Sequence, residues 1–341
     1  MKALDASKLG DLAGALAKAG YRVVAPVLDD GVLRLAEYEP DREIQTGGVT
    51  VNSLKDFLMP RSEVIGAAAL DGDEFTVEPV SPEAPKTCLL CVRPCDAAAL
   101  AALDAVFNWD YADAFYNARR EALTVVSLAC TACDEQCFCT SVGGAPDAGA
   151  GADAILRPAE GGKTLILEPL TDKGQAVAAA AGGLLADTEA QPDPPADVPV
   201  RFDAADVTEW CADNFEADLW NTVSLACLGC GACAYACPAC HCFDMQDEGN
   251  RAKSVRLRNW DSCGFGLFTA HASGHNPRPE QAARWRQRVM HKFSYMPERF
   301  ELLGCTGCGR CARVCPAGMA ICETCQLIAN QTAKTPEGEA K

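Results

Sequence analysis

The sequence predicts a protein of two domains, an N-terminal α/β domain with a partly parallel sheet and a mainly helical, cysteine-rich domain after it. Two short apolar segments, 86–92 and 122–129, are each followed by a polar loop, and a helix-like segment lies between them. This order of strand, loop, helix and strand is typical of α/β folds. Most of the 21 cysteines lie after residue 200, in closely spaced motifs.

The N-terminal elements follow from local patterns. Leucines recur at helical spacing over 5–19, and Ser7 stands where it could cap that helix. Segments 21–27 and 32–38 flank the turn sequence LDDG and predict a hairpin. After the first apolar strand, a helix is expected over 96–107.

A proline-rich loop, QPDPPADVP, ends the first domain, which we place at residues 1–200. The second domain is expected at 201–330, beginning with a helix at 204–220 and containing a basic insertion at 240–300. The polar segment 331–341 predicts a disordered tail.

Composition excludes several classes of protein. The formal net charge of −17 argues against nucleic-acid binding, because phosphates would be repelled. The N-terminus has no apolar secretory segment, and no uncharged run is long enough to span a bilayer. In a chain of 341 residues, clustered CxxC spacings favour metal binding over disulfides. We therefore expect a cytoplasmic protein with reduced thiols.

Two motifs, CLGCGACAYACP and CTGCGRCARVCP, match the C-x2-C-x2-C-x3-C-P run of bacterial [4Fe–4S] proteins. Their small residues let backbone amides approach the cluster, and the fourth cysteine of each run binds the other cluster. Zinc sites lack this three-plus-one spacing before proline. The sequence therefore predicts a dicluster ferredoxin-like domain with two cysteine sets: Cys227, Cys230, Cys233 and Cys315 for the first cluster, and Cys305, Cys308, Cys311 and Cys237 for the second.

A third cysteine group is predicted in the N-terminal domain. Cys95 and Cys130 follow the two apolar strands, so both lie at one sheet edge if those strands are parallel neighbours. Cys137 and Cys139 alternate along a CFC segment and can face the same way. These four thiols predict a third [4Fe–4S] cluster. Alternatives are Cys133 in place of Cys130, a redox-active thiol pair, or no metal.

The motifs CVRPCDAAALAALDAVF, CFCTS, CPACHCF, NWDSCGF and RWRQRVMHKFSY, in this order, resemble one family. It is the beta subunit of sulfhydrogenase-type cytoplasmic NiFe hydrogenases, with the related iron–sulfur subunit of anaerobic sulfite reductase. The similarity runs from about residue 50 to 325. The resemblance implies that Cys95, Cys130, Cys137 and Cys139 bind the third cluster, without Cys133. Position 91 departs from the pattern, being cysteine where the family usually has glycine, which leaves open an altered ligand set or an additional thiol.

The resemblance also implies a function. Such subunits carry electrons between a flavin subunit that handles NAD(P) and a catalytic subunit, either a NiFe hydrogenase or a sulfur or sulfite reductase. No dinucleotide-binding fingerprint is found, so the flavin and nicotinamide are expected on another chain. The chain is expected not to be catalytic alone. The alternatives are a catalytic subunit with a substrate-reactive thiol or cluster, and a structural metal-binding scaffold.

Several further residues keep two interpretations. Cys240, His241, Cys242 and Cys263 are either auxiliary ligands or hydrogen-bond partners of a cluster, or packing residues. Segment 250–300 is rich in arginine and lysine, either as a solvated face or as a basic collar for clusters or an acidic partner. Packing or surface roles are expected for the remaining cysteines and histidines: Cys88, Cys91, Cys211, Cys322, Cys325, His271, His275 and His291.

Overall fold

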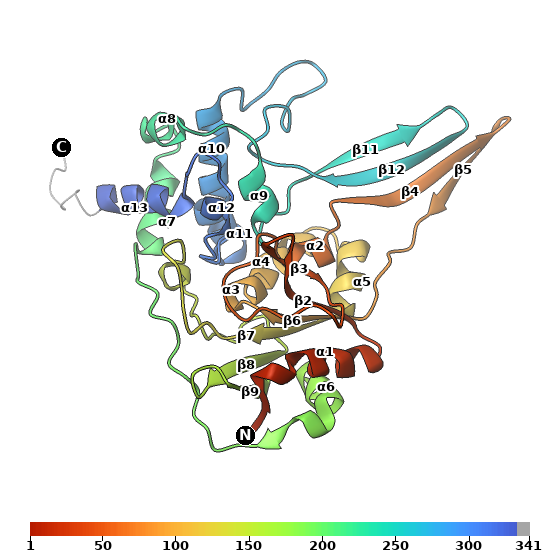
Figure 1. Ribbon diagram of the computed structural model, residues 1–341. Coiled ribbons are helices and arrows are strands. Elements are labelled where there is room, and N and C mark those ends of the chain that lie inside the picture. The colour runs from red at the N-terminus through yellow and green to blue at the C-terminus, as the bar shows by residue number, and fades with distance from the viewer. Residues whose placement is uncertain (333–341) are drawn as a thin grey trace.

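A computed structural model describes residues 1–332. Its larger sheet has eight strands in the order β10-β1-β9-β8-β7-β6-β2-β3, of which the four consecutive strands β8, β7, β6 and β2 are parallel (Figure 1). The strands are β1 Lys2–Asp5, β2 Arg22–Asp29, β3 Val32–Glu37, β6 Thr87–Val92, β7 Leu123–Leu128, β8 Ala154–Ala159, β9 Thr164–Pro169 and β10 Ala186–Asp187. The predicted α/β architecture with a partly parallel sheet is confirmed.

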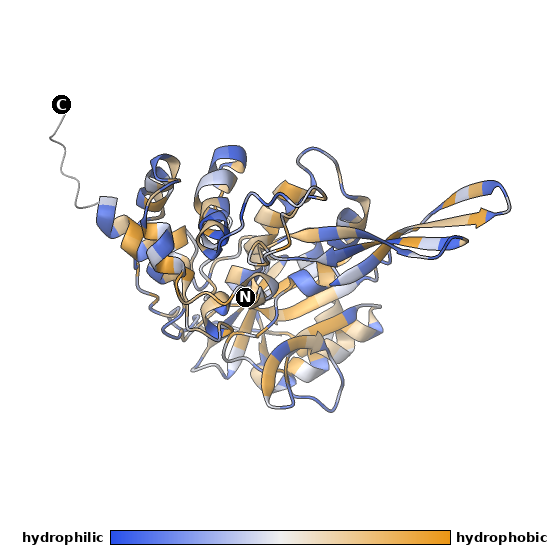
Figure 2. Cartoon of the chain, turned by 90° about the horizontal axis from the view of Figure 1, so that it is seen from above, coloured by the Kyte–Doolittle hydropathy of each residue, from blue (hydrophilic) through white to orange (hydrophobic). Residues whose placement is uncertain are grey.

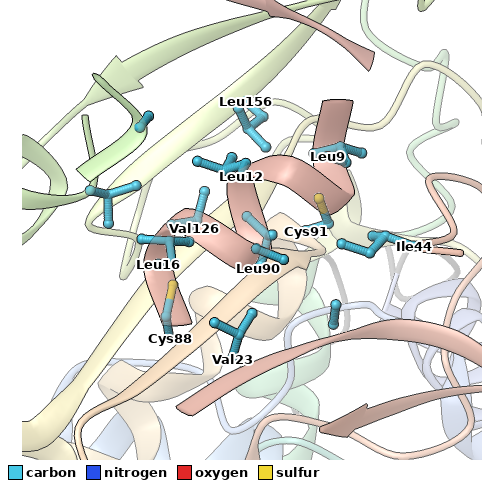
Figure 3. Close-up of a cluster of buried hydrophobic side chains, with 14 of the residues drawn as sticks. Leu9, Leu12, Leu16, Val23, Ile44, Cys88, Leu90, Cys91, Val126 and Leu156 are labelled. Carbon is cyan, nitrogen blue, oxygen red and sulfur yellow. The ribbon is translucent and has the colours of Figure 1, made fainter. Parts of the chain in front are cut away.

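Helices cover both faces of this sheet. On one face, α1 (Leu9–Lys18) and α6 (Asp172–Ala181) enclose an apolar core, and Figure 3 shows leucines of α1 packing over Leu90 and Val126. On the other face lie α2 (Lys55–Leu58), α3 (Pro94–Ala97), α4 (Ala99–Phe107) and α5 (Ala114–Ala122). Because side chains alternate along a strand, β6 contributes Leu90 to one core and Leu89 to the other.

Two local predictions need correction. Ser7 does not cap the first helix, because the carboxylate of Asp5 accepts the Ser7 backbone N–H at 2.8 Å and a short 3₁₀ turn, Ala6–Lys8, precedes α1. The helix expected over 204–220 is two helices, α7 Ala204–Asp213 and α8 Leu219–Ser224. Asn214 separates them, since its side-chain amide donates to the Trp210 carbonyl and takes the place of the next helical bond.

A second, four-stranded antiparallel sheet projects from the body of the molecule as an arm (Figures 1 and 2). Its order is β11-β12-β4-β5, from strands Phe243–Gly249, Lys253–Trp260, Ser62–Asp71 and Glu74–Pro79. The arm thus joins two hairpins, one from each side of the boundary predicted near residue 200. It was not expected from the sequence.

The remaining elements surround the two ferredoxin motifs. They are α9 Ala232–Ala236, α10 Gln281–Met290, α11 Met296–Phe300, α12 Arg310–Arg313 and α13 Ile321–Thr332, with 3₁₀ turns at Cys139–Val142 and Gly182–Leu184. A π-helical turn, η4 (His291–Tyr295), joins α10 to α11. Of the predicted tail, Gln331 and Thr332 belong to α13, and residues 333–341 lie outside the described residues. Within residues 1–332, no helix is long and apolar enough to cross a membrane.

Candidate metal centres

The four cysteines predicted for the first cluster line a single cavity: Cys227, Cys230, Cys233 and Cys315. Two N–H groups point at their sulfur atoms. Gln281 Nε2 lies 3.0 Å from Cys227 Sγ, and the backbone N of Met319 lies 3.3 Å from Cys315 Sγ. Hydrogen bonds to the ligand sulfurs are one means by which a protein sets the reduction potential of an iron–sulfur cluster.

The second predicted set is more deeply buried. Burial raises the pKa of Cys305 to about 12; Lys292 opposes this rise, and the thiols of Cys237 and Cys311 add to it. Burial likewise raises the pKa of Cys308 to about 11, and the same neighbours, Cys237 and Cys311, add to the rise. The four thiols therefore lie within electrostatic range of one another. Lys292 Nζ lies 3.4 Å from Cys237 Sγ, where its charge favours the thiolate that binds iron.

Both motif loops use glycine in the left-handed region, at Gly229, Gly231, Gly307 and Gly309, with φ between +65° and +73°. In the second loop the glycines also allow a close approach of another loop. A Cβ on Gly307 would lie 2.5 Å from Cys139 Cα, and one on Gly309 would lie 2.3 Å from the Gln136 carbonyl oxygen. The backbone N–H of Phe138 donates to the Gly307 carbonyl at 3.0 Å. The CFC segment of the N-terminal domain therefore packs directly on the second ferredoxin loop.

The third predicted set lines a cavity of about 190 Å³ at the carboxyl edge of the parallel strands. Cys95 lies in α3, just after β6, and Cys130 follows β7, its parallel neighbour. The cavity is lined by Cys95, Cys130, Cys133, Cys137 and Cys139, and Cys308 of the second set forms part of the same wall.

Cys133 differs from the other four. It is exposed, and its thiol donates to the Asp197 carbonyl at 3.3 Å. The nearby thiols of Cys130 and Cys137 each raise the pKa of Cys139, and Cys130 raises that of Cys95. Burial is the largest cause of the raised pKa at both Cys139 and Cys95. The structure thus groups four thiols and leaves Cys133 at the rim.

Two arginines of α12 connect the second and third sets. Arg310, 1% exposed, pairs with the equally buried Asp96 at 2.6 Å and donates to the Thr50 carbonyl at 2.7 Å. Arg313 pairs with Asp134, and its Nη2 lies 3.3 Å from Cys137 Sγ. Sequence reasoning missed both residues, although they stand inside the motif CTGCGRCARVCP.

The chemistry of these sites fits iron–sulfur clusters. Each set offers four thiols, with cations and N–H donors beside them. No group of His, Cys, Asp or Glu in residues 1–332 is arranged to hold a single metal ion. Ligands of a single ion converge on one point, whereas the thiolates of a cubane bind separate irons and stand further apart.

Other predicted residues divide between core and surface. Cys88 and Cys91 lie in the core under α1, as Figure 3 shows. Cys211, Cys322 and Cys325 lie in the core of the ferredoxin part.

The basic segment has both buried and exposed side chains. Arg288 and Lys292 are buried beside cysteines, and other arginines are exposed in ion pairs, such as Arg256 with Asp247. His271 and His275 are exposed.

Comparison with known proteins adds the family. The model of a 4Fe-4S dicluster domain matches residues 226–319. Sulfhydrogenase 2 subunit beta of Pyrococcus furiosus is 31% identical over 247 residues, which cover 68% of this chain and 71% of that protein. The chain belongs to the sulfhydrogenase beta-subunit family. The resemblance predicted from the motifs is therefore confirmed. No solved structure matches this beta-subunit homologue.

The dicluster match bears on the cofactor of this sulfhydrogenase beta-subunit homologue. The matched region contains all eight motif cysteines, from Cys227 to Cys315. The chain therefore has a C-terminal 4Fe-4S dicluster domain and is an iron–sulfur protein. Cys95, Cys130, Cys137 and Cys139 lie outside the matched region, so a third cluster remains a prediction.

Proposed function

We propose that this chain is the electron-transfer subunit of an oxidoreductase complex and relays single electrons through three [4Fe–4S] clusters. Its partners are a flavin subunit that handles NAD(P) and a catalytic subunit, either a NiFe hydrogenase or a sulfur or sulfite reductase. The relative's name, a beta subunit of a sulfhydrogenase, supports a place in such a complex.

One observation carries the proposal: the loop of the third cysteine set packs on the second ferredoxin loop with no residue between them. Gly307 meets Cys139, and Cys308 lines the cavity of the third set. Electron transfer between clusters requires short separations, which this contact supports. Clusters supply one-electron redox chemistry, while the chain supplies spacing, hydrogen bonds and exclusion of water.

The cysteine sets form a sequence of sites in space. The third set adjoins the second, because Cys308 of the second set lines the cavity of the third. The second set also adjoins the first. Burial is the largest cause of the raised pKa of Cys233 in the first set, Arg288 lowers that pKa, and the nearby thiol of Cys311 in the second set raises it. Such an arrangement supports a relay better than an isolated catalytic centre. A structural scaffold would not need buried cations beside the thiols. Such cations favour the reduced state of a cluster, because reduction adds negative charge.

The first experiment measures iron, acid-labile sulfide and EPR spectra on anaerobically purified chain. Cys137→Ser should contain about four irons fewer than wild type, because one cubane is lost. Cys211→Ser, a buried cysteine outside the three sets, is the matched control and should retain its iron. Unchanged iron in Cys137→Ser would overturn the third cluster.

The second experiment tests the relay in the assembled complex. Cys137→Ser should lower NAD(P)H-driven turnover by at least about tenfold, because one electron-transfer step is lost, while dye-driven turnover of the catalytic subunit stays near wild type. Full NAD(P)H-driven turnover in the variant would contradict a relay through this site. Turnover by the isolated beta chain would instead favour the catalytic alternative.

A further inference from the structure

A further group of thiols lies outside the three cysteine sets described above. Cys240, Cys242 and Cys263 line one small cavity together with His241 and His291. The cavity encloses about 20 Å³, comparable with about 30 Å³ at the first ferredoxin set. Three soft sulfur ligands and two imidazoles around one space form a metal-binding donor set.

The arm hairpin brings two of these thiols together. Phe243, the first residue of β11, pairs with Trp260, the last residue of β12. Cys242 precedes that pair and Cys263 follows it, and the backbone N–H of Asp261 donates to the Cys242 carbonyl at 3.0 Å. The hairpin therefore fixes Cys242 against Cys263, although they are separated in the sequence.

The third thiol joins them through local geometry. Cys240 and Cys242 alternate along the CHC segment, as Cys137 and Cys139 do along CFC, so their sulfurs can face the same way. His241 lines the same cavity: its ring lies 5.0 Å from the ring of His291, and its Nδ1 lies 3.1 Å from the Ala239 carbonyl oxygen. His291 is the better candidate ligand, because the Nδ1 of His241 is already engaged by that carbonyl. It opens the π-helical turn η4, a form often found at functional sites.

Three buried cations near this cavity have no carboxylate partner among the described residues. Lys55, Arg288 and Lys292 are each at most 5% exposed. None of them has a carboxylate ion-pair partner in the part of the chain that the structure describes. Arg288 Nη1 lies 4.0 Å from Cys240 Sγ, and its Nε and Nη2 have no hydrogen-bond partner among the described residues. Buried cations require nearby negative charge. The thiolate of Cys237, 3.4 Å from Lys292 Nζ, provides part of it, and thiolates bound to iron at this cavity would add to it.

We propose that Cys240, Cys242 and Cys263, with His291 as the fourth ligand, hold an additional [4Fe–4S] cluster. A multi-iron group is proposed because the donor set resembles the dicluster sites, with thiols around one cavity and buried cations beside them. The position is central, since Cys240 contacts Cys237 of the second set and Cys263 lines the cavity of the first.

The role of this site in electron transfer rests on the proposed function. The cluster would accept one electron from a neighbouring cluster and pass it on, with no bond made or broken. Its existence is a separate question, and cluster counts on paired variants separate the two proposals.

The test is anaerobic native mass spectrometry with iron analysis on the full chain. Cys242→Ser and Cys263→Ser should each lose about four irons relative to wild type, while Cys322→Ser, a buried thiol of α13, should lose none. Four clusters in wild type and three in Cys137→Ser support both proposals. Three clusters in both wild type and Cys137→Ser support the site at Cys240, Cys242 and Cys263 without the third set. Three clusters in wild type that fall to two in Cys137→Ser overturn this site.

A second variant guards against loss of folding. His291→Cys should retain the iron of wild type, while one EPR-active centre shifts to a lower midpoint potential, because thiolate in place of imidazole lowers the potential of a cluster. His271→Cys, an exposed histidine, is the control and should leave every potential unchanged. Unaltered potentials in His291→Cys would remove His291 from the ligand set.

Discussion

Cys91 adopts a backbone conformation that is costly for a residue with a side chain. Its φ is +61°, in the left-handed region, and the register of β6 against β7 shifts between Leu90 and Val92. Glycine, which the resemblance described above leads us to expect at this position, adopts this conformation without strain. The thiol is buried under α1 (Figure 3), and burial raises its pKa to about 12. It therefore packs as a small apolar side chain.

This left-handed conformation predicts how substitutions of Cys91 change the stability of the protein. Cys91→Gly should be more stable than Cys91→Ala by about 1 kcal/mol, because alanine keeps the left-handed strain that glycine relieves. Cys88, in the regular part of β6, is the matched control. There the order should reverse, with glycine less stable than alanine by about 0.5–1 kcal/mol. Anaerobic urea unfolding measures both pairs, and the same order at both positions would contradict the interpretation.

At the scale of residues, spacing was enough to predict the eight motif cysteines, whereas leaving Cys133 out of the third set depended on the family resemblance. Spacing could not reveal Arg310, because its importance depends on burial beside a partner distant in the sequence. Asp96 and Arg310 are 214 positions apart. No local pattern marks such a pair.

At the scale of elements, the contact between the CFC segment and the second ferredoxin loop determines the spacing of two sites. It depends on the absence of a side chain at Gly307. Gly318 has nearly the same backbone, with φ of +66° against +65°, but an added Cβ there would meet nothing within 4 Å. The two glycines therefore separate backbone strain from loop packing.

We expect Gly307→Ala to lower iron content by at least about four atoms, since its Cβ would push Cys139 and the third set away. Gly318→Ala should carry similar strain and retain its iron. Iron analysis and EPR on both proteins make the comparison. Equal iron loss in the two variants would mean that strain, and not loop packing, is responsible.

Most single elements of the N-terminal domain could be predicted, including the β2–β3 hairpin and the parallel strands β6 and β7. The arm could not. β4 carries four alanine or glycine residues in a row, Gly66 to Ala69, so it shows little alternation of apolar and polar side chains. Its partner β12 lies in the segment interpreted only as basic. Pairing between strands so far apart leaves no signal in either one.

At the scale of the whole molecule, Arg310 connects the two parts of the chain. It lies in α12 of the ferredoxin part and contacts Asp96 of α3 and Thr50. Removing one member of a buried ion pair leaves the other charge uncompensated, which is more damaging than replacing both.

Arg310→Met should therefore lower the free energy of unfolding by about 3–5 kcal/mol. The double variant Arg310→Met with Asp96→Leu should recover part of this loss. Asp247→Asn, which removes an exposed ion pair with Arg256, is the control and should cause little change. Anaerobic denaturation followed by circular dichroism gives the values. A double variant as unstable as the sum of its single variants would show that the two charges do not interact.

The arm also constrains how the protein is made. During synthesis β4 and β5 leave the ribosome long before β12, and an isolated hairpin is only marginally stable in water. Until β12 has emerged, the edge of β4 that faces away from β5 has no partner strand. The second sheet can therefore form only when most of the chain exists. A subunit that recognised this arm would bind finished chains and pass over incomplete ones.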